Sequence, residues 1–125
     1  MKILLTGGSG FIGTNIKEDL ADRYWIFAPT HKELDLLDEN EVERFLDKCG
    51  VDVVIHSAVK PGHRNAKDPT NLFYSNTRMY YNLARHSDKY KRMIILSSGA
   101  IYDTSQSLHK VSENYYVGQF PTDDH

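Results

Sequence analysis

The chain has 125 residues, 40% of them hydrophobic, and a formal net charge of −2 at pH 7. This length suits a single domain with its own core, and the near-neutral charge excludes electrostatic nucleic-acid binding, which needs a basic excess. No apolar run approaches the ~20 residues of a membrane-spanning helix, and the six histidines show no metal-ligand spacing. From the histidine spacing we expect no metal site. The single cysteine, Cys49, excludes an internal disulfide, and no signal peptide is expected before the first strand, so we expect a cytoplasmic protein.

Strand-like and helix-like segments alternate from the start of the chain. Residues 2–6 form an apolar run that predicts a strand. In residues 11–21 the i, i+4 spacing of Ile12, Ile16 and Leu20 predicts a helix that faces a sheet. The further elements predicted, in order, are a strand at 24–28, a helix from the N-cap Asp38 to Lys48, a strand at 51–56, a helix from Pro69 to His86 and a strand at 93–97.

This alternation is typical of parallel strands joined by right-handed crossovers. The sequence therefore predicts an α/β fold, a Rossmann-like doubly wound parallel sheet that is truncated after about four strands. With the strands numbered along the chain, we expect the order 3-2-1-4. We expect a ligand at the carboxyl ends of the strands, where the first and fourth strands diverge.

A glycine-rich turn, T-G-G-S-G-F-I-G at residues 6–13, joins the first strand to the first helix. Gly7, Gly10 and Gly13 allow a tight turn, close approach of a phosphate, and contact between helix and strand. The helix that begins there presents free amides to the same anion, those of Phe11, Ile12 and Gly13. The turn therefore predicts a site for a dinucleotide pyrophosphate, with a purely structural turn as the alternative.

Four further motifs follow the glycine turn in the chain: L-D-L-L-D at 34–38, H-S-A at 56–58, Asn76, and S-S-G-A-I-Y at 97–102. Together with the turn they resemble the extended short-chain dehydrogenase/reductase family, the NAD(P)-dependent nucleotide-sugar epimerases, dehydratases and reductases. The chain is most similar to the branch of that family that epimerises and reduces 4-keto-6-deoxysugars. The resemblance implies that residues 1–125 are the N-terminal part of the cofactor-binding domain, and that the partner is a nucleotide sugar.

The resemblance also assigns roles to residues outside the glycine turn. Asp35 would accept a hydrogen bond from the adenine amino group while Leu36 packs on the ring. The cofactor ribose would be bordered by Ala58, Val59 and Lys60. Taken from the residues alone, Asp35 reads equally as a solvated acid, Leu36 as a core leucine and Lys60 as an ordinary exposed lysine.

Asn76 lies on a helical stripe with Leu72, Met79 and Leu83, so its amide is expected to point inward among apolar side chains. A buried amide without partners costs ~1–3 kcal/mol. It is therefore either a structural tie to a neighbouring loop or part of the polar network of the site. The resemblance favours the second role, as a cofactor-binding residue.

Ser98 is the catalytic residue that the resemblance implies, because the family's serine holds the substrate oxygen beside a tyrosine that transfers the proton. That tyrosine belongs to a Tyr-x-x-x-Lys motif, and none of the eight tyrosines here has a lysine four residues later. We expect the motif just beyond His125, with the substrate domain also absent. The chain alone would then be inactive and bind the cofactor weakly. The alternative is a self-standing nucleotide-binding or regulatory module.

The choice of nicotinamide cofactor depends on the end of the second strand, where NAD sites carry an acid for the ribose 2′-hydroxyl. Residues 28–32 read A-P-T-H-K, without an acid, and Lys32 with Thr30 and His31 could meet a 2′-phosphate. Ser9 stands where many NADP enzymes have a basic residue, but the balance favours NADP. The strand at 93–97 would be an open apolar edge, which predicts a homo-oligomer.

Overall fold

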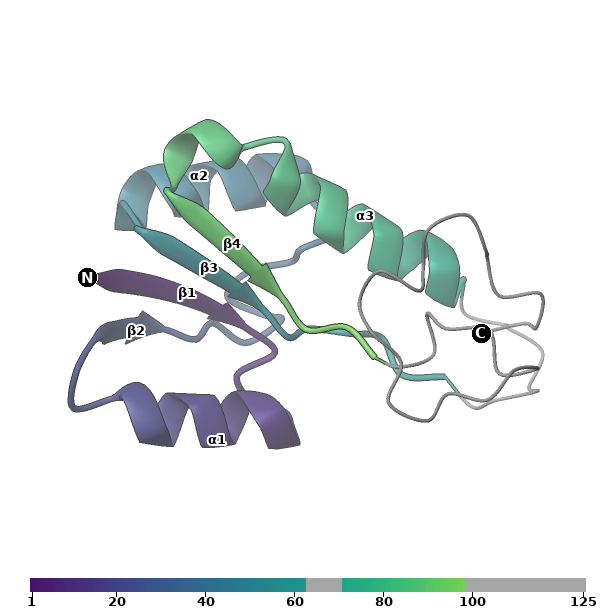
Figure 1. The fold of residues 1–125 in the computed structure, drawn as a ribbon. Coiled ribbons are helices and arrows are strands. Elements are labelled where there is room, and N and C mark those ends of the chain that lie inside the picture. Colours follow the sequence, from purple (N-terminus) through teal and green to yellow (C-terminus); the bar gives the residue numbers. More distant parts are fainter. Residues whose placement is uncertain (63–70, 99–125) are drawn as a thin grey trace, which may run out of the picture. The chain divides into compact units, whose positions relative to one another are not determined.

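The computed structural model describes residues 1–62 and 71–98 (Figure 1). Its elements are β1 (Lys2–Thr6), α1 (Phe11–Leu20), β2 (Trp25–Phe27), α2 (Glu39–Cys49), β3 (Val53–His56), α3 (Leu72–Ala84), the 3-10 turn η1 (Ser87–Lys89) and β4 (Arg92–Ile95). All of these elements belong to one compact unit, whereas Ser97 and Ser98 belong to a second. Within the described ranges, no helix combines the length and the apolar character required to cross a membrane.

The four strands form one parallel sheet in the order β2-β1-β3-β4. The α/β class and the Rossmann-like parallel sheet are thus confirmed, but the predicted order is corrected, because β3 pairs with β1 and not with β2. Burial explains the difference: Val54, Ile55 and His56 are buried, which requires a strand on each side. The three-residue β2 begins with the exposed Trp25 and suits an edge.

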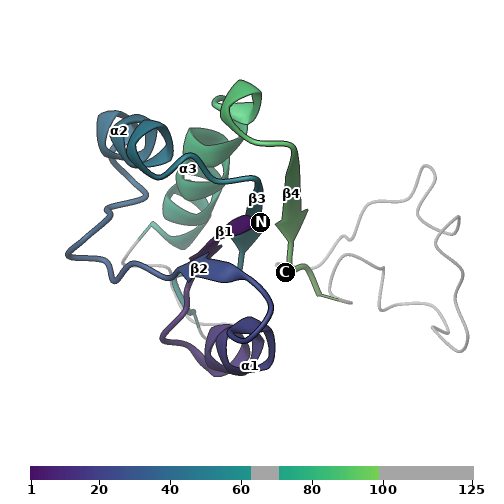
Figure 2. The ribbon, with the colours of Figure 1, turned by 90° about the vertical axis from the view of Figure 1, so that its left-hand side faces the viewer.

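Helices cover both faces of the sheet, with α1 on one side and α2 and α3 on the other (Figures 1 and 2). Because side chains alternate along a strand, β1 serves both faces. Ile3 and Leu5 pack with Ile55 beneath α1. Leu4 packs with Val54, Val42 and Leu46 of α2 and Leu83 of α3. Each fully buried Leu or Val of this kind contributes about 1.5–3 kcal/mol to folding.

Both ends of α2 are set by capping residues that can be identified in the sequence. The Asp38 carboxylate accepts hydrogen bonds from the Asn40 and Glu41 amides at 2.8 and 3.1 Å, which confirms the predicted N-cap. Gly50 adopts a left-handed conformation with φ of +56° and donates its N–H to the Leu46 carbonyl, which ends the helix. By contrast, the N-cap of α1 is Gly10, which has no side chain to cap the helix.

The direction in which successive strands are added to the sheet reverses at β1. From β1 it passes through α1 to β2 on one side, and α2 then returns it to β3 on the other side. Ligands of doubly wound sheets bind where the carboxyl ends of the strands diverge in this way. The site is therefore placed between β1 and β3, not between the first and fourth strands as the predicted order implied.

Candidate functional site

A cavity of about 370 Å³ lies at the carboxyl ends of β1, β2 and β3. Its walls include the following predicted site residues: Gly7, Thr30, Asp35, Leu36, Ala58, Val59 and Lys60. They come from three separate loops, so the fold brings together what the sequence holds up to 53 positions apart. Lys32 is exposed and does not line the cavity, although it was predicted to meet a 2′-phosphate.

The glycines of the turn have different reasons to be glycine. Gly7 has φ of +71°, and a Cβ there would lie 2.7 Å from the Ala58 nitrogen. A Cβ at Gly13 would lie 2.1 Å from the Gly7 carbonyl oxygen, so this glycine lets α1 pack against the turn. A Cβ at Gly10 would meet only that same oxygen, at 3.3 Å. Gly7 and Gly13 therefore serve packing, whereas Gly10 is exposed and its Cβ would meet no atom other than that oxygen.

The first turn of α1 fits an anion. The Gly10 N–H donates to the Gly7 carbonyl at 3.0 Å, but α1 has no side-chain cap and no acidic residue in its first turn. The N–H groups of the first helical turn lack intrahelical partners, and the helix dipole adds partial positive charge there. Phe11 and Ile12 are exposed. The free amides and the partial positive charge at this helix start suit an anionic group such as a phosphate.

The segment 35–38 forms one wall of the cavity and is held by its own hydrogen bonds. The Asp35 Oδ1 atom accepts from the Leu37 N–H at 2.9 Å, and the Asp35 N–H donates to Glu41 at 3.0 Å. The Asp35 Oδ2 atom has no hydrogen-bond partner within the described ranges, so it remains available to an amino group. Leu36 is 7% exposed and belongs to the core while also lining the cavity, which satisfies both interpretations of this residue.

An acidic residue that was not predicted as part of the site, Glu33, lies six residues after the end of β2 and does not line the cavity. The Glu33 carboxylate accepts from both the N–H and the hydroxyl of Thr30 at 2.8 Å. These two hydrogen bonds lower the pKa of Glu33 below its usual value, and the bond from the Thr30 backbone N–H has the larger effect. Thr30-x-x-Glu33 is a capping-box spacing, and Glu33 directly follows residues 28–32, so the sequence carried the signal for this contact.

Asn76 ties the opposite wall of the cavity. Its Oδ1 atom accepts from the Lys60 N–H at 2.7 Å, and its Nδ2 atom donates to the Lys60 carbonyl at 3.2 Å. Of the two roles that the residues left open, the structure shows the tie to a neighbouring loop. Asn76 does not itself line the cavity, and its role as a cofactor-binding residue stays a prediction.

A buried contact between β1 and β3 supports the floor of the site. The Thr6 Oγ1 atom lies 2.8 Å from the His56 Nδ1 atom and accepts from the Ala58 N–H at 3.2 Å. Burial lowers the pKa of His56, so the imidazole is neutral at pH 7. The histidine thus joins two strand ends at the cavity, a role that the H-S-A motif alone did not reveal.

Ser98 belongs to the second compact unit and is exposed. The remainder of the S-S-G-A-I-Y motif after Ser98 lies outside the described residues, as does His125, where the chain ends. The catalytic role of Ser98 therefore stays a prediction.

Comparison with known proteins agrees with this geometry. The sequence profile of the NAD dependent epimerase/dehydratase family matches residues 3–122. The chain belongs to this family. The family resemblance that the motifs carried, through the glycine turn, Asp35 and the H-S-A segment, is thereby confirmed.

Individual relatives of the epimerase/dehydratase family give the same picture. The chain is 36% identical over 106 residues to a GDP-L-fucose synthase from Azorhizobium caulinodans, and the aligned region covers 81% of this chain and 34% of the relative. It is 33% identical over 107 residues to a GDP-L-colitose synthase from Yersinia pseudotuberculosis, covering 82% and 35%. A solved structure of MlghC, a GDP-mannoheptose C4 reductase from Campylobacter jejuni with NADP bound, superposes with a TM-score of 0.81 at 26% identity, over 93% of this chain and 38% of that one. The chain spans about a third of the length of the curated relatives it matches.

Proposed function

We propose that this chain is the cofactor-binding portion of an NAD(P)-dependent enzyme that acts on a nucleotide sugar, specifically an epimerase–reductase of a GDP-linked 4-keto-6-deoxysugar. The observation that carries the proposal is the uncapped start of α1, which begins two residues after Ser9 in the wall of the β1–β3 cavity. The named relatives, a GDP-L-fucose synthase and a GDP-L-colitose synthase, support the sugar class.

The residues present fit a dinucleotide in a definite order. The pyrophosphate would bind the amides at the start of α1. The adenine would lie against Leu36, with its amino group donating to the Asp35 Oδ2 atom, and the ribose would lie at the loop of Ala58 and Lys60. When bound, the nicotinamide supplies hydride transfer to or from the sugar. In this proposal Ser98 holds the substrate oxygen and orients it.

We propose NADP as the cofactor, supported by the NADP-bound reductase among the structural relatives. Of the three residues expected at the 2′-phosphate, Thr30 and His31 line the cavity and Lys32 does not. The Thr30 donors are already bonded to Glu33, so a 2′-phosphate must share them with a carboxylate. This competition weakens the contact to a 2′-phosphate, so we expect the preference for NADP over NAD to be modest.

Titration of the 125-residue chain with NADPH and NADH, followed by nucleotide fluorescence, tests the proposal. We expect saturable but weak binding of both, with NADPH bound more tightly, and competition by 5′-AMP. Because the family's lysine is absent from the chain, micromolar affinity would contradict the expected weakness of the nicotinamide half. Absence of saturable binding by either nucleotide would refute the proposed function.

A further inference from the structure

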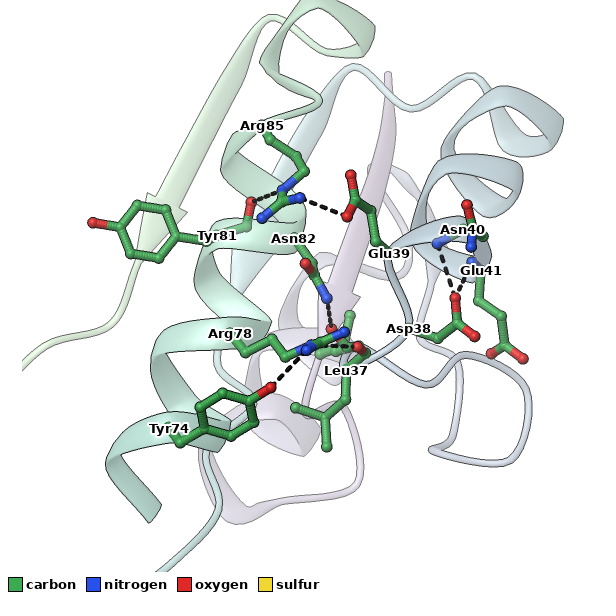
Figure 3. Close-up of polar contacts among 11 residues, drawn as sticks. Leu37, Asp38, Glu39, Asn40, Glu41, Tyr74, Arg78, Tyr81, Asn82 and Arg85 are labelled. Carbon is green, nitrogen blue, oxygen red and sulfur yellow. Dashed lines mark hydrogen bonds and ion pairs between the residues drawn. The ribbon is translucent and has the colours of Figure 1, made fainter. Parts of the chain in front are cut away.

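Two side chains of α3 hold the adenine-side wall of the cavity through its backbone. The Arg78 Nε atom donates to the Leu37 carbonyl at 2.8 Å, and the Asn82 Nδ2 atom donates to the Leu36 carbonyl at 2.9 Å (Figure 3). Asn82 is 1% exposed, so this bond is made within the core. The Asp35 N–H donates to Glu41, so backbone groups of three successive wall residues, 35 to 37, are each hydrogen-bonded to a side chain.

The Arg78 guanidinium is itself held in place. Its Nη1 atom donates to the Tyr74 hydroxyl at 2.6 Å, and its centre lies 5.8 Å from the Tyr74 ring centroid (Figure 3). These residues stand one helical turn apart, the spacing at which side chains of a helix meet. Arg78 therefore reaches the Leu37 carbonyl from a braced position, although it lies on the exposed side of α3.

The same helix also contacts the opposite wall. Asn76 bonds the Lys60 backbone twice, while Ser75 and Met79 of α3 line the cavity between the two walls. One rigid element thus holds the loop after β3 and the segment 35–38 at a defined separation.

We propose that Arg78 and Asn82 are positioning residues of the cofactor cavity, which hold the Leu36–Leu37 wall in the conformation that binds adenine. The proposal rests on the proposed function, because it assigns adenine to this wall. A wall that is ordered before binding avoids the entropy loss of ordering it on binding. Loss of the Arg78 bond leaves the Leu37 carbonyl without a protein partner and lets the wall adopt other conformations.

The test uses Arg78→Met in the full 125-residue chain, because Arg78 is exposed and its replacement leaves the core intact. Arg85→Met is the matched control: Arg85 lies two turns further along α3, and it bonds Glu39 and the Tyr81 carbonyl, neither of which lines the cavity (Figure 3). Affinity for 5′-AMP is measured by NMR titration, stability by urea unfolding, and order of the wall by amide hydrogen exchange.

We expect Arg78→Met to raise the Kd for 5′-AMP about five- to tenfold, the effect of one lost hydrogen bond. Exchange at the amides of residues 36–38 should become faster, and Arg78→Lys should restore part of the affinity. Arg85→Met should leave both quantities unchanged at a similar unfolding free energy. Equal affinity of the two methionine variants would overturn the inference alone. Failure of the wild-type chain to bind 5′-AMP and NADPH would overturn the proposed function and this inference with it.

Discussion

Replacing Gly13 by alanine separates the packing role of the glycine turn from its ligand role. The added Cβ would lie 2.1 Å from the Gly7 carbonyl oxygen and 2.8 Å from the Gly7 carbonyl carbon and the Gly8 Cα. All of these are backbone atoms that no side-chain rotation can move. Because the interior is close-packed, α1 must shift by about 1 Å away from the turn.

The magnitude follows from that shift. Overpacking a well-packed interior costs typically about 1–3 kcal/mol, and the rigid backbone neighbours place Gly13→Ala at the upper end. With a urea m-value of about 1–3 kcal/mol/M for a small domain, the midpoint should fall by about 1–2 M. Urea unfolding followed by circular dichroism measures this change.

Gly10→Ala is the control for this prediction. Its Cβ meets only the Gly7 oxygen at 3.3 Å, and the Gly10 φ of −76° suits any residue. The unfolding free energy should change by less than about 1 kcal/mol, while NADPH binding is lost because the methyl group fills the space left for the pyrophosphate. If Gly13→Ala proves as stable as Gly10→Ala, the described contact between α1 and the turn is wrong.

Three further predictions concern other parts of the chain. Asp38→Ala removes the N-cap of α2 and should lower the unfolding free energy by about 1 kcal/mol in urea titrations. Because burial lowers the pKa of His56, the unfolded chain binds a proton more readily than the folded chain, and the unfolding free energy should fall as pH drops below about 6.5. The substitution His56→Gln should flatten this dependence of stability on pH between about pH 7.5 and 5. An unchanged slope would exclude His56 as the cause. Ile94 and Ile95 of β4 are 43% and 48% exposed beside an edge that has no further strand within the described ranges, so the chain should self-associate and Ile95→Lys should reduce this; a monodisperse wild-type monomer in light scattering at tens of micromolar would count against it.

Local rules allowed much of the fold to be predicted from the sequence. The cap at Asp38 depends on near neighbours and is confirmed. The apolar spacing of α1 is confirmed for Ile16 and Leu20, which pack against the sheet, but the prediction was wrong for Ile12, which is 52% exposed. The strand order depends instead on which strands are buried on both sides. A short apolar run does not reveal this, and only the folded chain shows Trp25 of β2 to be exposed, as suits an edge strand.

The site was predictable where the ligand approaches backbone, and less so where side chains support that backbone. The turn glycines were predicted from what a pyrophosphate requires, and Asp35 from the family resemblance, and Gly7 and Asp35 line the cavity. Arg78 bonds Leu37, 41 positions away in the sequence, and Asn82 bonds Leu36, 46 positions away. No local sequence pattern predicts a contact between residues so far apart. Asn76 shows the same limit: it was expected to be buried among apolar side chains, but it is half-buried, and its partner, the Lys60 backbone, became known only in the folded chain.

The central claim is that the β1–β3 cavity binds a dinucleotide with its pyrophosphate at the start of α1. Titration of the ¹⁵N-labelled chain with NADP, followed by amide chemical shifts, tests it most directly, with Gly10→Ala as the control. Saturable shifts are predicted at residues 7–13, Leu36 and Ala58, and their loss is predicted in the variant. Shifts confined to other surfaces, or equal binding by Gly10→Ala, would contradict the claim.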